Sequence, residues 1–364
     1  MAAKERADCG ELRLSTTPRF GSTLRVSLLI LATVSPINAA RADEGGVSFW
    51  APGFFGSLAS APQMPGWSLA TIYYHTSVSG SGNIGLSREL EIKNVPVNLK
   101  ANISPSVNGT GDLGFVIPSY VFATPVLGGQ AAVALAGAYG RVNSSLSGTV
   151  SGTVNGIPFG PRSDSISDTL WGFSDLIPQA SLRWNNGVNN YMTYITGDIP
   201  VGAYDPNRLA NTGIGHGAID AGGGYTYFNP MTGQEFSATA GLTYNLTNSS
   251  TNYQNGVDFH LDWGASQFVS KQVQLGLVGY AYKQLSCDSG SGDLLGCFES
   301  QVFGVGQQLG LIFPVGDKQG YLNFKGYKEF GAENRASGWN TWVTFVITPA
   351  PPTPNTPTKR MIAK

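Results

Sequence analysis

The sequence has little charge, and that shortage excludes several classes of protein. Of 364 residues only 12% are charged, whereas soluble domains carry about 25%. Lys and Arg number 22 against 23 Asp and Glu, so the basic excess of a nucleic-acid-binding protein is absent. The chain instead contains 48 Gly, 18 Phe, 15 Tyr and 7 Trp. So many aromatic residues with so little net charge exclude an intrinsically disordered chain.

Long apolar runs are also missing, except near the N-terminus. There a basic leader precedes the apolar run 26–34 and an Ala-Arg-Ala pattern at 40–42, which is typical of a secretory signal peptide. We therefore expect a signal peptide over 1–42, with cleavage between Ala42 and Asp43. No other stretch reaches the 18 or more apolar residues of a membrane-spanning helix, and a membrane β-barrel stays open.

Cysteine is scarce as well. Export would remove Cys9 with the leader and leave Cys287 and Cys297, which flank a Gly- and Ser-rich stretch, CDSGSGDLLGC. Disulfides persist in the oxidising compartments that exported proteins reach. We expect the two cysteines to form a disulfide, and the alternative is two unrelated loop thiols.

What the sequence does contain is alternation of apolar and polar residues. Residues 256–268 read GVDFHLDWGASQF, and residues 235–245 read EFSATAGLTYN. Both alternate with a period of two, which indicates β-strands with two different faces. The predicted strands run for about ten residues, which is longer than the five or six that are usual in soluble sheets.

Short connections alternate with longer loops rich in Gly, Asn and Ser, such as 141–170, 199–216 and 286–298. Bacterial outer-membrane barrels are built in this way. The alternation predicts an all-β fold, a transmembrane antiparallel up-and-down barrel of about twelve strands. These are expected near 67–79, 112–124, 130–141, 171–185, 189–199, 217–228, 234–246, 256–269, 272–285, 299–314, 319–331 and 338–348. The stretch 80–111 is then a long outer excursion; if it spans the membrane, the count becomes fourteen.

A soluble sandwich or propeller is the rival fold. Its outward faces should carry Lys, Glu and Arg, but here the polar faces contain mainly Gly, Ser, Thr and Asn. A barrel would turn its apolar faces to lipid and its polar faces to a lumen that needs few charges. Aromatic residues near the predicted strand ends, such as Tyr73, Tyr74, Trp339 and Trp342, suggest girdles at the membrane interfaces.

Two segments flank the barrel, which we place at 67–348. Segment 43–66 contains three prolines and cannot form a regular strand, yet its apolar residues need cover. We expect it to enter the periplasmic mouth as a partial plug, through Phe49, Trp50, Phe54, Phe55 and Leu58. The Pro-rich tail 349–364 is expected to be extended.

Seven polar residues are expected to face the lumen and to act in selectivity or in pairing across it: Arg183, Glu235, Asp258, His260, Asp262, Lys325 and Glu329. A lumen of twelve strands should be narrow, and polar side chains in a constriction decide what passes.

Chemistry beyond transport has weak support in the sequence. Asp258, His260 and Asp262 share one strand face, but neighbours on a face lie about 6.5–7 Å apart, so we expect no metal site and no cofactor. Some outer-membrane barrels are lipid-modifying enzymes, and His260 lies between two acids. No G-x-S-x-G motif accompanies it, and we expect no enzyme. A structural or adhesive barrel without transport is the other alternative.

The chain resembles the outer-membrane family named for the MetA-pathway of phenol degradation. The resemblance covers about 47–348 and rests on stretches such as APGFFGSLASAPQMPGWSLATIYYHTS, GDIPVGAYDPNRLANTGIGHGAIDAGGGYTYFNPMTG and KEFGAENRASGW. It implies an outer-membrane barrel that assists the uptake of small, often aromatic compounds, without established catalytic residues. Many outer-membrane barrels end at their last strand with an aromatic residue, whereas here residues 349–364 follow the last predicted strand.

These observations predict a bacterial outer-membrane channel for passive uptake of small hydrophobic or aromatic compounds through a narrow, partly plugged lumen. The expected partners are outer-membrane lipid, the solute and the barrel-assembly machinery, with no nucleic acid.

Overall fold

The computed structural model describes residues 48–81, 99–154, 156–293, 297 and 299–351. All of them belong to one compact unit, Arg41–Lys364. The predicted signal peptide, its cleavage site between Ala42 and Asp43, and tail residues 352–364 lie outside the described residues. Across the described ranges, no helix is long and apolar enough to cross a membrane.

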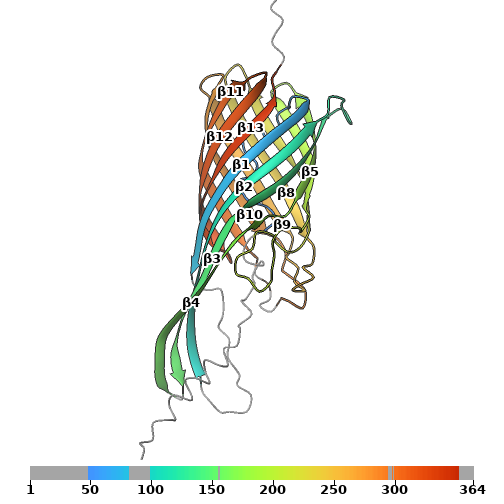
Figure 1. The fold of residues 1–364 in the computed structure, drawn as a ribbon. Helices are drawn as coiled ribbons and strands as arrows, with labels where there is room; N and C mark the ends of the chain where they lie inside the picture. Colours follow the sequence, from blue (N-terminus) through green and yellow to red (C-terminus); the bar gives the residue numbers. More distant parts are fainter. Residues whose placement is uncertain (1–47, 82–98, 155, 294–296, 298, 352–364) are drawn as a thin grey trace, which may run out of the picture. The chain divides into compact units, whose positions relative to one another are not determined.

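The described chain folds into thirteen β-strands (Figure 1). In chain order they are β1 (Gly66–Ser81), β2 (Leu99–Val121), β3 (Gln130–Val154), β4 (Ile157–Phe173), β5 (Ile177–Asn186), β6 (Asn189–Asp198), β7 (Ala218–Asn229), β8 (Gln234–Asn245), β9 (Asp258–Phe268), β10 (Val273–Gln284), β11 (Gln301–Val315), β12 (Lys318–Glu333) and β13 (Ser337–Pro349).

The strands close into an antiparallel barrel. β1 pairs with β2 on one side and with β13 on the other, which closes the ring. β4 and β5 pair with successive parts of β3, with Tyr139 opposite Phe173 and Ala136 opposite Ile177. They are therefore two parts of one barrel strand, interrupted at Ser174. The barrel has twelve strands, and this confirms the predicted fold and count.

Strands β2, β3 and β4 are longer than predicted. Residues 141–170, expected as a loop, instead form the end of β3 and most of β4, which pair from Asn143–Thr169 to Val154–Ile157. Residues 99–110, expected within the excursion 80–111, belong to β2, while 82–98 lie outside the described residues. The prediction failed because Ser, Gly and Asn are typical loop residues, whereas here they pair as strands.

The two faces of the strands differ as the alternation predicts. On β8 the side chain of Phe236 is 43% exposed, whereas that of its neighbour Ser237 is 1% exposed. The buried side chains of the barrel include many polar ones, and large apolar side chains occupy the outer surface. This inverts the arrangement of a soluble domain and matches a wall that lipid surrounds.

The aromatic residues named for the girdles divide between the two faces. Tyr73 and Trp339 are exposed on the outer surface, whereas Trp342 is fully buried inside the barrel. Tyr74 packs on Trp342 with ring centroids 4.3 Å apart. The girdle prediction is wrong for Trp342 and Tyr74, because residues 342 and 74 fall on the inward positions of their strands.

Candidate functional site

The segment that precedes β1 contacts inward-facing side chains of β9 and β12. Asp262 of β9 accepts the Gly53 N–H at 2.8 Å on Oδ1 and the Phe55 N–H at 3.0 Å on Oδ2. Lys325 of β12 donates from Nζ to the Gly53 carbonyl at 2.5 Å and to the Phe55 carbonyl at 3.2 Å. One carboxylate and one ammonium thus hold both polar edges of the same short stretch of backbone. We call residues 48–65 the N-terminal segment and these four bonds the latch.

Other wall residues hold the rest of the segment. Glu235 of β8 accepts the Leu58 N–H at 3.0 Å, and Arg183 of β5 donates from Nε to the Ala59 carbonyl at 3.3 Å. Both wall side chains are buried. Buried charges need such partners because an unpaired one is costly, so the segment satisfies charges that would otherwise face an empty lumen.

His260 contacts the segment through its ring. The Trp50 indole lies on the imidazole with centroids 3.7 Å apart and planes inclined by 12°. His260 Nε2 lies 2.8 Å from Asp220 Oδ2 and 3.3 Å from the Tyr194 hydroxyl. Because both rings are buried, the stack closes this part of the lumen.

The two remaining predicted lumen residues bond to the wall itself. Asp258 accepts the Tyr282 hydroxyl at 2.8 Å, and Glu329 accepts the Tyr280 hydroxyl at 2.8 Å and the Gly338 N–H at 2.7 Å. All seven predicted residues are buried, and five of them contact the N-terminal segment. A role of these residues in selectivity stays a prediction.

The segment fits closely because the wall and the segment contain glycine at contact points. A Cβ on Gly264 of β9 would meet Ser57 Oγ at 2.7 Å, so only glycine leaves room there for the segment backbone. Gly53 adopts a φ of +91°, in the region that glycine enters without strain, beside the Tyr327 ring. The high glycine content thus has a specific use at this contact.

The five predicted plug residues have different environments. Phe49 and Trp50 are buried, while Phe54, Phe55 and Leu58 are half-buried. The Trp50 ring lies 6.0 Å from that of Phe54 and 5.4 Å from that of Phe55. The aromatic side chains of the segment therefore form one cluster inside the barrel.

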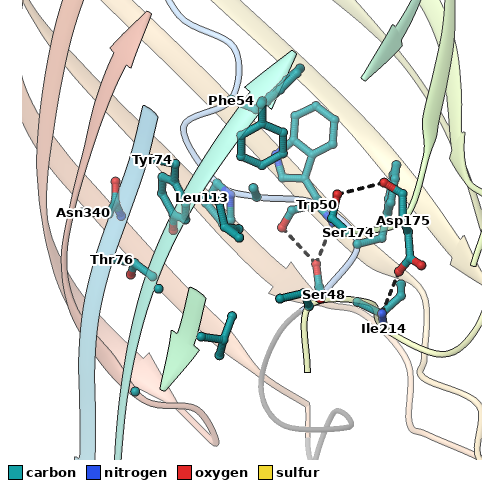
Figure 2. A pocket seen from close by; sticks show the side chains of 18 of the residues that line it. Ser48, Trp50, Phe54, Tyr74, Thr76, Leu113, Ser174, Asp175, Ile214 and Asn340 are labelled. Carbon is teal, nitrogen blue, oxygen red and sulfur yellow. Dashed lines mark hydrogen bonds between the residues drawn. The ribbon is translucent and has the colours of Figure 1, made fainter. Parts of the chain in front are cut away.

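A cavity of about 300 Å³ lies between this cluster and the opposite wall (Figure 2). The wall side consists mostly of apolar side chains from β1, β2, β3 and β5, among them Leu113, Phe115, Ile117, Ala136 and Ile177. Phe49, Trp50 and Phe54 line the segment side. The inner surface of the barrel is therefore divided: polar side chains of β5, β8, β9 and β12 bond to the segment, and the cavity borders mostly apolar side chains.

Some polar groups at the cavity are bonded by the protein, whereas Trp50 Nε1, Asp198 Oδ1 and Arg335 Nε of the lining have no hydrogen-bond partner among the described residues. Asp175, which follows β4, accepts the Gly202 and Ile214 N–H groups, each at 2.7 Å. Asn340 of β13 donates to the Tyr280 hydroxyl and accepts the Trp342 Nε1–H. The surface of the cavity is mainly apolar, although its lining also includes the charged residues Asp198, Glu329 and Arg335.

The loop 199–217 between β6 and β7 forms part of the cavity rim, with Thr212 and Ile214 in the lining. Arg208 of this loop binds Asp168 of β4 through two hydrogen bonds, of 2.7 and 3.0 Å. The hydrogen bonds from Arg208 lower the pKa of Asp168 to about 2. The loop is thus held by Asp175 beside the cavity and by Asp168, which lies earlier in the chain on β4.

The geometry around His260 differs from that of a hydrolase or a metal centre. In the part of the chain that the structure describes, its hydrogen-bond partners include no serine or cysteine. Asp262 binds segment amides and Asp258 binds Tyr282, so the three residues of the D-x-H-x-D pattern have different partners. Elsewhere, Cys287 and Cys297 form a disulfide in the loop between β10 and β11.

Sequence reasoning missed the apolar wall and Asp175. The sequence pattern assigns apolar side chains to the outside of the barrel and small or polar ones to the inside. That rule fails for three apolar residues on inward positions, Leu113, Ala136 and Ile177. The weaker alternation at 130–140 was the available signal. Asp175 had none, because its role depends on the interruption between β4 and β5.

Comparisons with known proteins agree with this fold. An outer-membrane channel from Pseudomonas putida F1 is 14% identical with a TM-score of 0.56, and the match covers 82% of this chain and 99% of that one. Two matches have lower TM-scores. The translocator domain of the autotransporter NalP from Neisseria meningitidis has a TM-score of 0.37 at 10% identity, covering 80% and 90% of the two chains. The transport unit of the autotransporter AIDA-I from Escherichia coli has 0.38 at 12%, covering 80% and 95%.

No curated protein matches the sequence significantly. A family profile does, over residues 94–345, which include the barrel from before β2 to within β13. The chain therefore belongs to the family described as "Putative MetA-pathway of phenol degradation".

Proposed function

We propose that the protein is an outer-membrane channel that passively admits small hydrophobic or aromatic solutes, with the N-terminal segment as a partial plug. The observation that carries this proposal is the apolar cavity beside the segment. Ligand sites for apolar molecules are concave, largely apolar and about 300 Å³ or more in volume. A cavity with this lining favours an uncharged aromatic ring over a sugar.

The outer surface supports the membrane location. Large apolar side chains such as Leu135, Ile195 and Leu277 are exposed on it, and a water-soluble protein would leave these groups in water. The family to which the chain belongs and the fold shared with a channel are consistent with transport. Energy coupling is not needed in this proposal, because a solute can move down its own concentration gradient.

The proposal is tested by filling the cavity. Ala136 is buried and lines it, so Ala136→Phe should occupy space that a solute needs. The matched control is Val133→Phe, which adds bulk on the lipid-facing side of the same strand, where residue 133 is exposed. We would measure uptake of radiolabelled naphthalene and of glucose in a deletion strain that expresses each variant.

Ala136→Phe is expected to lower naphthalene uptake several-fold, while Val133→Phe keeps the wild-type rate and glucose uptake stays low in all strains. Equal naphthalene uptake by wild type and by cells without the protein would overturn the proposal. Faster uptake of glucose than of naphthalene would replace it with a polar pore. Heat-modified mobility in electrophoresis would verify that each barrel is folded.

A further inference from the structure

The outer surface of β1 to β4 changes in character along the strands, and the pairing register defines each level. The level that contains Tyr73, Tyr139 and Phe173 is apolar and aromatic, and these three side chains are exposed. The next residues on the same face are His75, Asp112, Arg141 and Trp171, which lie opposite one another across four strands. This row is the first charged row beyond the apolar level, and we call it the ionic row.

Within the ionic row, Asp112 is already bound. Its Oδ1 accepts the Tyr73 hydroxyl at 2.6 Å and lies 2.7 Å from His75 Nδ1. Arg141 is exposed, and its charge interacts with that of Asp112, its register partner on β2, but no hydrogen bond of its guanidinium is among the described contacts. The row therefore offers an exposed guanidinium whose N–H groups have no described hydrogen-bond acceptor, flanked by the exposed indole of Trp171.

Beyond the ionic row the same face carries no charge over four rows. These rows are centred on Asn143, Ser145, Ser147 and Thr149 of β3, and we call them the hydroxyl face. Their register partners on β2 and β4, where side chains are described, are only Ser, Thr and Asn. Cross-strand spacings of about 4.8 Å, and about 6.8 Å along a strand, make the array about 20 Å long.

The hydroxyl face is a specific arrangement, because the opposite face of the same strands differs. There Val107, Leu146 and Ile166 form an apolar row, and the charged residues Arg162 and Asp164 follow on β4. On the hydroxyl face, neighbouring side chains bond to each other, as Ser106 does with Ser147 at 2.6 Å and Thr149 with Ser163 at 2.9 Å. Each such pair keeps one O–H donor and further oxygen lone pairs, which can bond to a sugar.

We propose that this face binds a phosphorylated glycolipid of the outer leaflet, that is, lipopolysaccharide. The inference rests on the outer-membrane location in the proposed function. Acyl chains would lie on the apolar level, a phosphate would bind Arg141, and sugars would lie along the hydroxyl face. A guanidinium pairs well with phosphate, and hydroxyl and amide side chains both donate to and accept from sugar hydroxyls. The order of these three chemistries along the strands is the order within such a lipid.

The test uses the purified full-length barrel in detergent and native mass spectrometry to count bound lipids during titration. The probes are lipopolysaccharide with core sugars, lipid A without them, and phosphatidylglycerol, which is anionic but has no sugar. Arg141→Glu tests the phosphate contact, and Arg162→Glu on the opposite face is the matched control. Ser145→Glu with Ser147→Glu tests the hydroxyl face.

Arg141→Glu is expected to weaken lipid A binding about tenfold or more, while Arg162→Glu leaves it unchanged. The double serine variant should lose the preference for core-containing lipopolysaccharide over lipid A but keep lipid A binding. The inference would be overturned if Arg162→Glu weakened lipid A binding as much as Arg141→Glu does, or if the wild-type protein bound phosphatidylglycerol as strongly as lipid A. Solute uptake by the same variants separates the outcomes, since intact uptake with lost lipid preference leaves the channel proposal standing.

Discussion

The sharpest prediction concerns the latch between Asp262 and the N-terminal segment. Asp262→Asn keeps the size of the side chain but removes its charge and turns one of its acceptors into a donor. One of the two hydrogen bonds to the Gly53 and Phe55 N–H groups is then lost, because the NH2 group of the new side chain faces a backbone N–H and neither can accept. A hydrogen bond to a charged group contributes about 1.5–3 kcal/mol. Since about 1.4 kcal/mol is a factor of ten, the ratio of open to closed segment should rise about 10- to 100-fold.

The assay is single-channel recording in planar bilayers. The control is Glu329→Gln on β12, because the buried Glu329 accepts hydrogen bonds from Tyr280 and Gly338 of the wall and no segment amide is among its described contacts. A deletion of 48–63 gives the conductance of a barrel without the segment. Asp262→Asn should open more often toward that level, while Glu329→Gln should behave as wild type.

Three results would refute parts of this reasoning. If the deletion conducts no better than the intact protein, the segment is not a plug. If the deletion opens the barrel but Asp262→Asn does not, the segment is a plug that the latch does not control. If Glu329→Gln opens as often as Asp262→Asn, the effect comes from general weakening of the wall. Lys325→Met, which removes the donor to the Gly53 and Phe55 carbonyls, should open the channel in the same direction as Asp262→Asn.

Other predictions follow from single contacts. Gly264→Val should expel the segment and raise conductance, because its Cβ would lie 2.7 Å from Ser57 Oγ; Gly223→Val, on the exposed face of β7, should not. Asp168 has its pKa lowered to about 2 by Arg208, so this contact is fully present above about pH 4 and is lost as the pH falls through about 2. Arg208→Gln should therefore make loop 199–217 sensitive to protease at neutral pH, and equal cleavage of both proteins would contradict this. Cys287→Ser with Cys297→Ser should expose the loop between β10 and β11 to protease, since closing so short a loop is worth about 3 kcal/mol; resistance equal to wild type would show that Asp288, which accepts the Gly256 N–H, suffices.

The barrel could be predicted from the sequence because its signal is local. Period-two alternation at 235–245 and 256–268 depends only on neighbours along one strand, and the structure has β8 and β9 there. The extension of β3 and β4 could not be predicted in this way. Residues such as Ser145, Ser147 and Ser167 are equally common in loops, and only their pairing across strands makes them sheet. Local propensity has little weight where long-range pairing decides.

The sequence predicted which residues face the lumen, but it did not predict which groups they contact. Period two places Asp258, His260 and Asp262 on one inward face, and all three are buried there. It gives no indication that the first bonds to Tyr282, the second stacks on Trp50 and the third holds Gly53 and Phe55. These partners come from a segment and a strand at other positions in the chain, and strand periodicity carries no information about either.

The division of the lumen gives the scarce charges a function other than lining a pore. Three charged residues bond to the backbone of the segment: Asp262, Lys325 and Glu235. Their charged groups therefore face the segment and do not line the cavity. A solute in the cavity would meet Phe115, Ala136 and Ile177 instead. If the segment is displaced, the same charges become exposed to the lumen. The protein should therefore favour apolar solutes while the segment is bound and ions once it is removed, so the Asp262→Asn channel should conduct more ions without gaining naphthalene uptake.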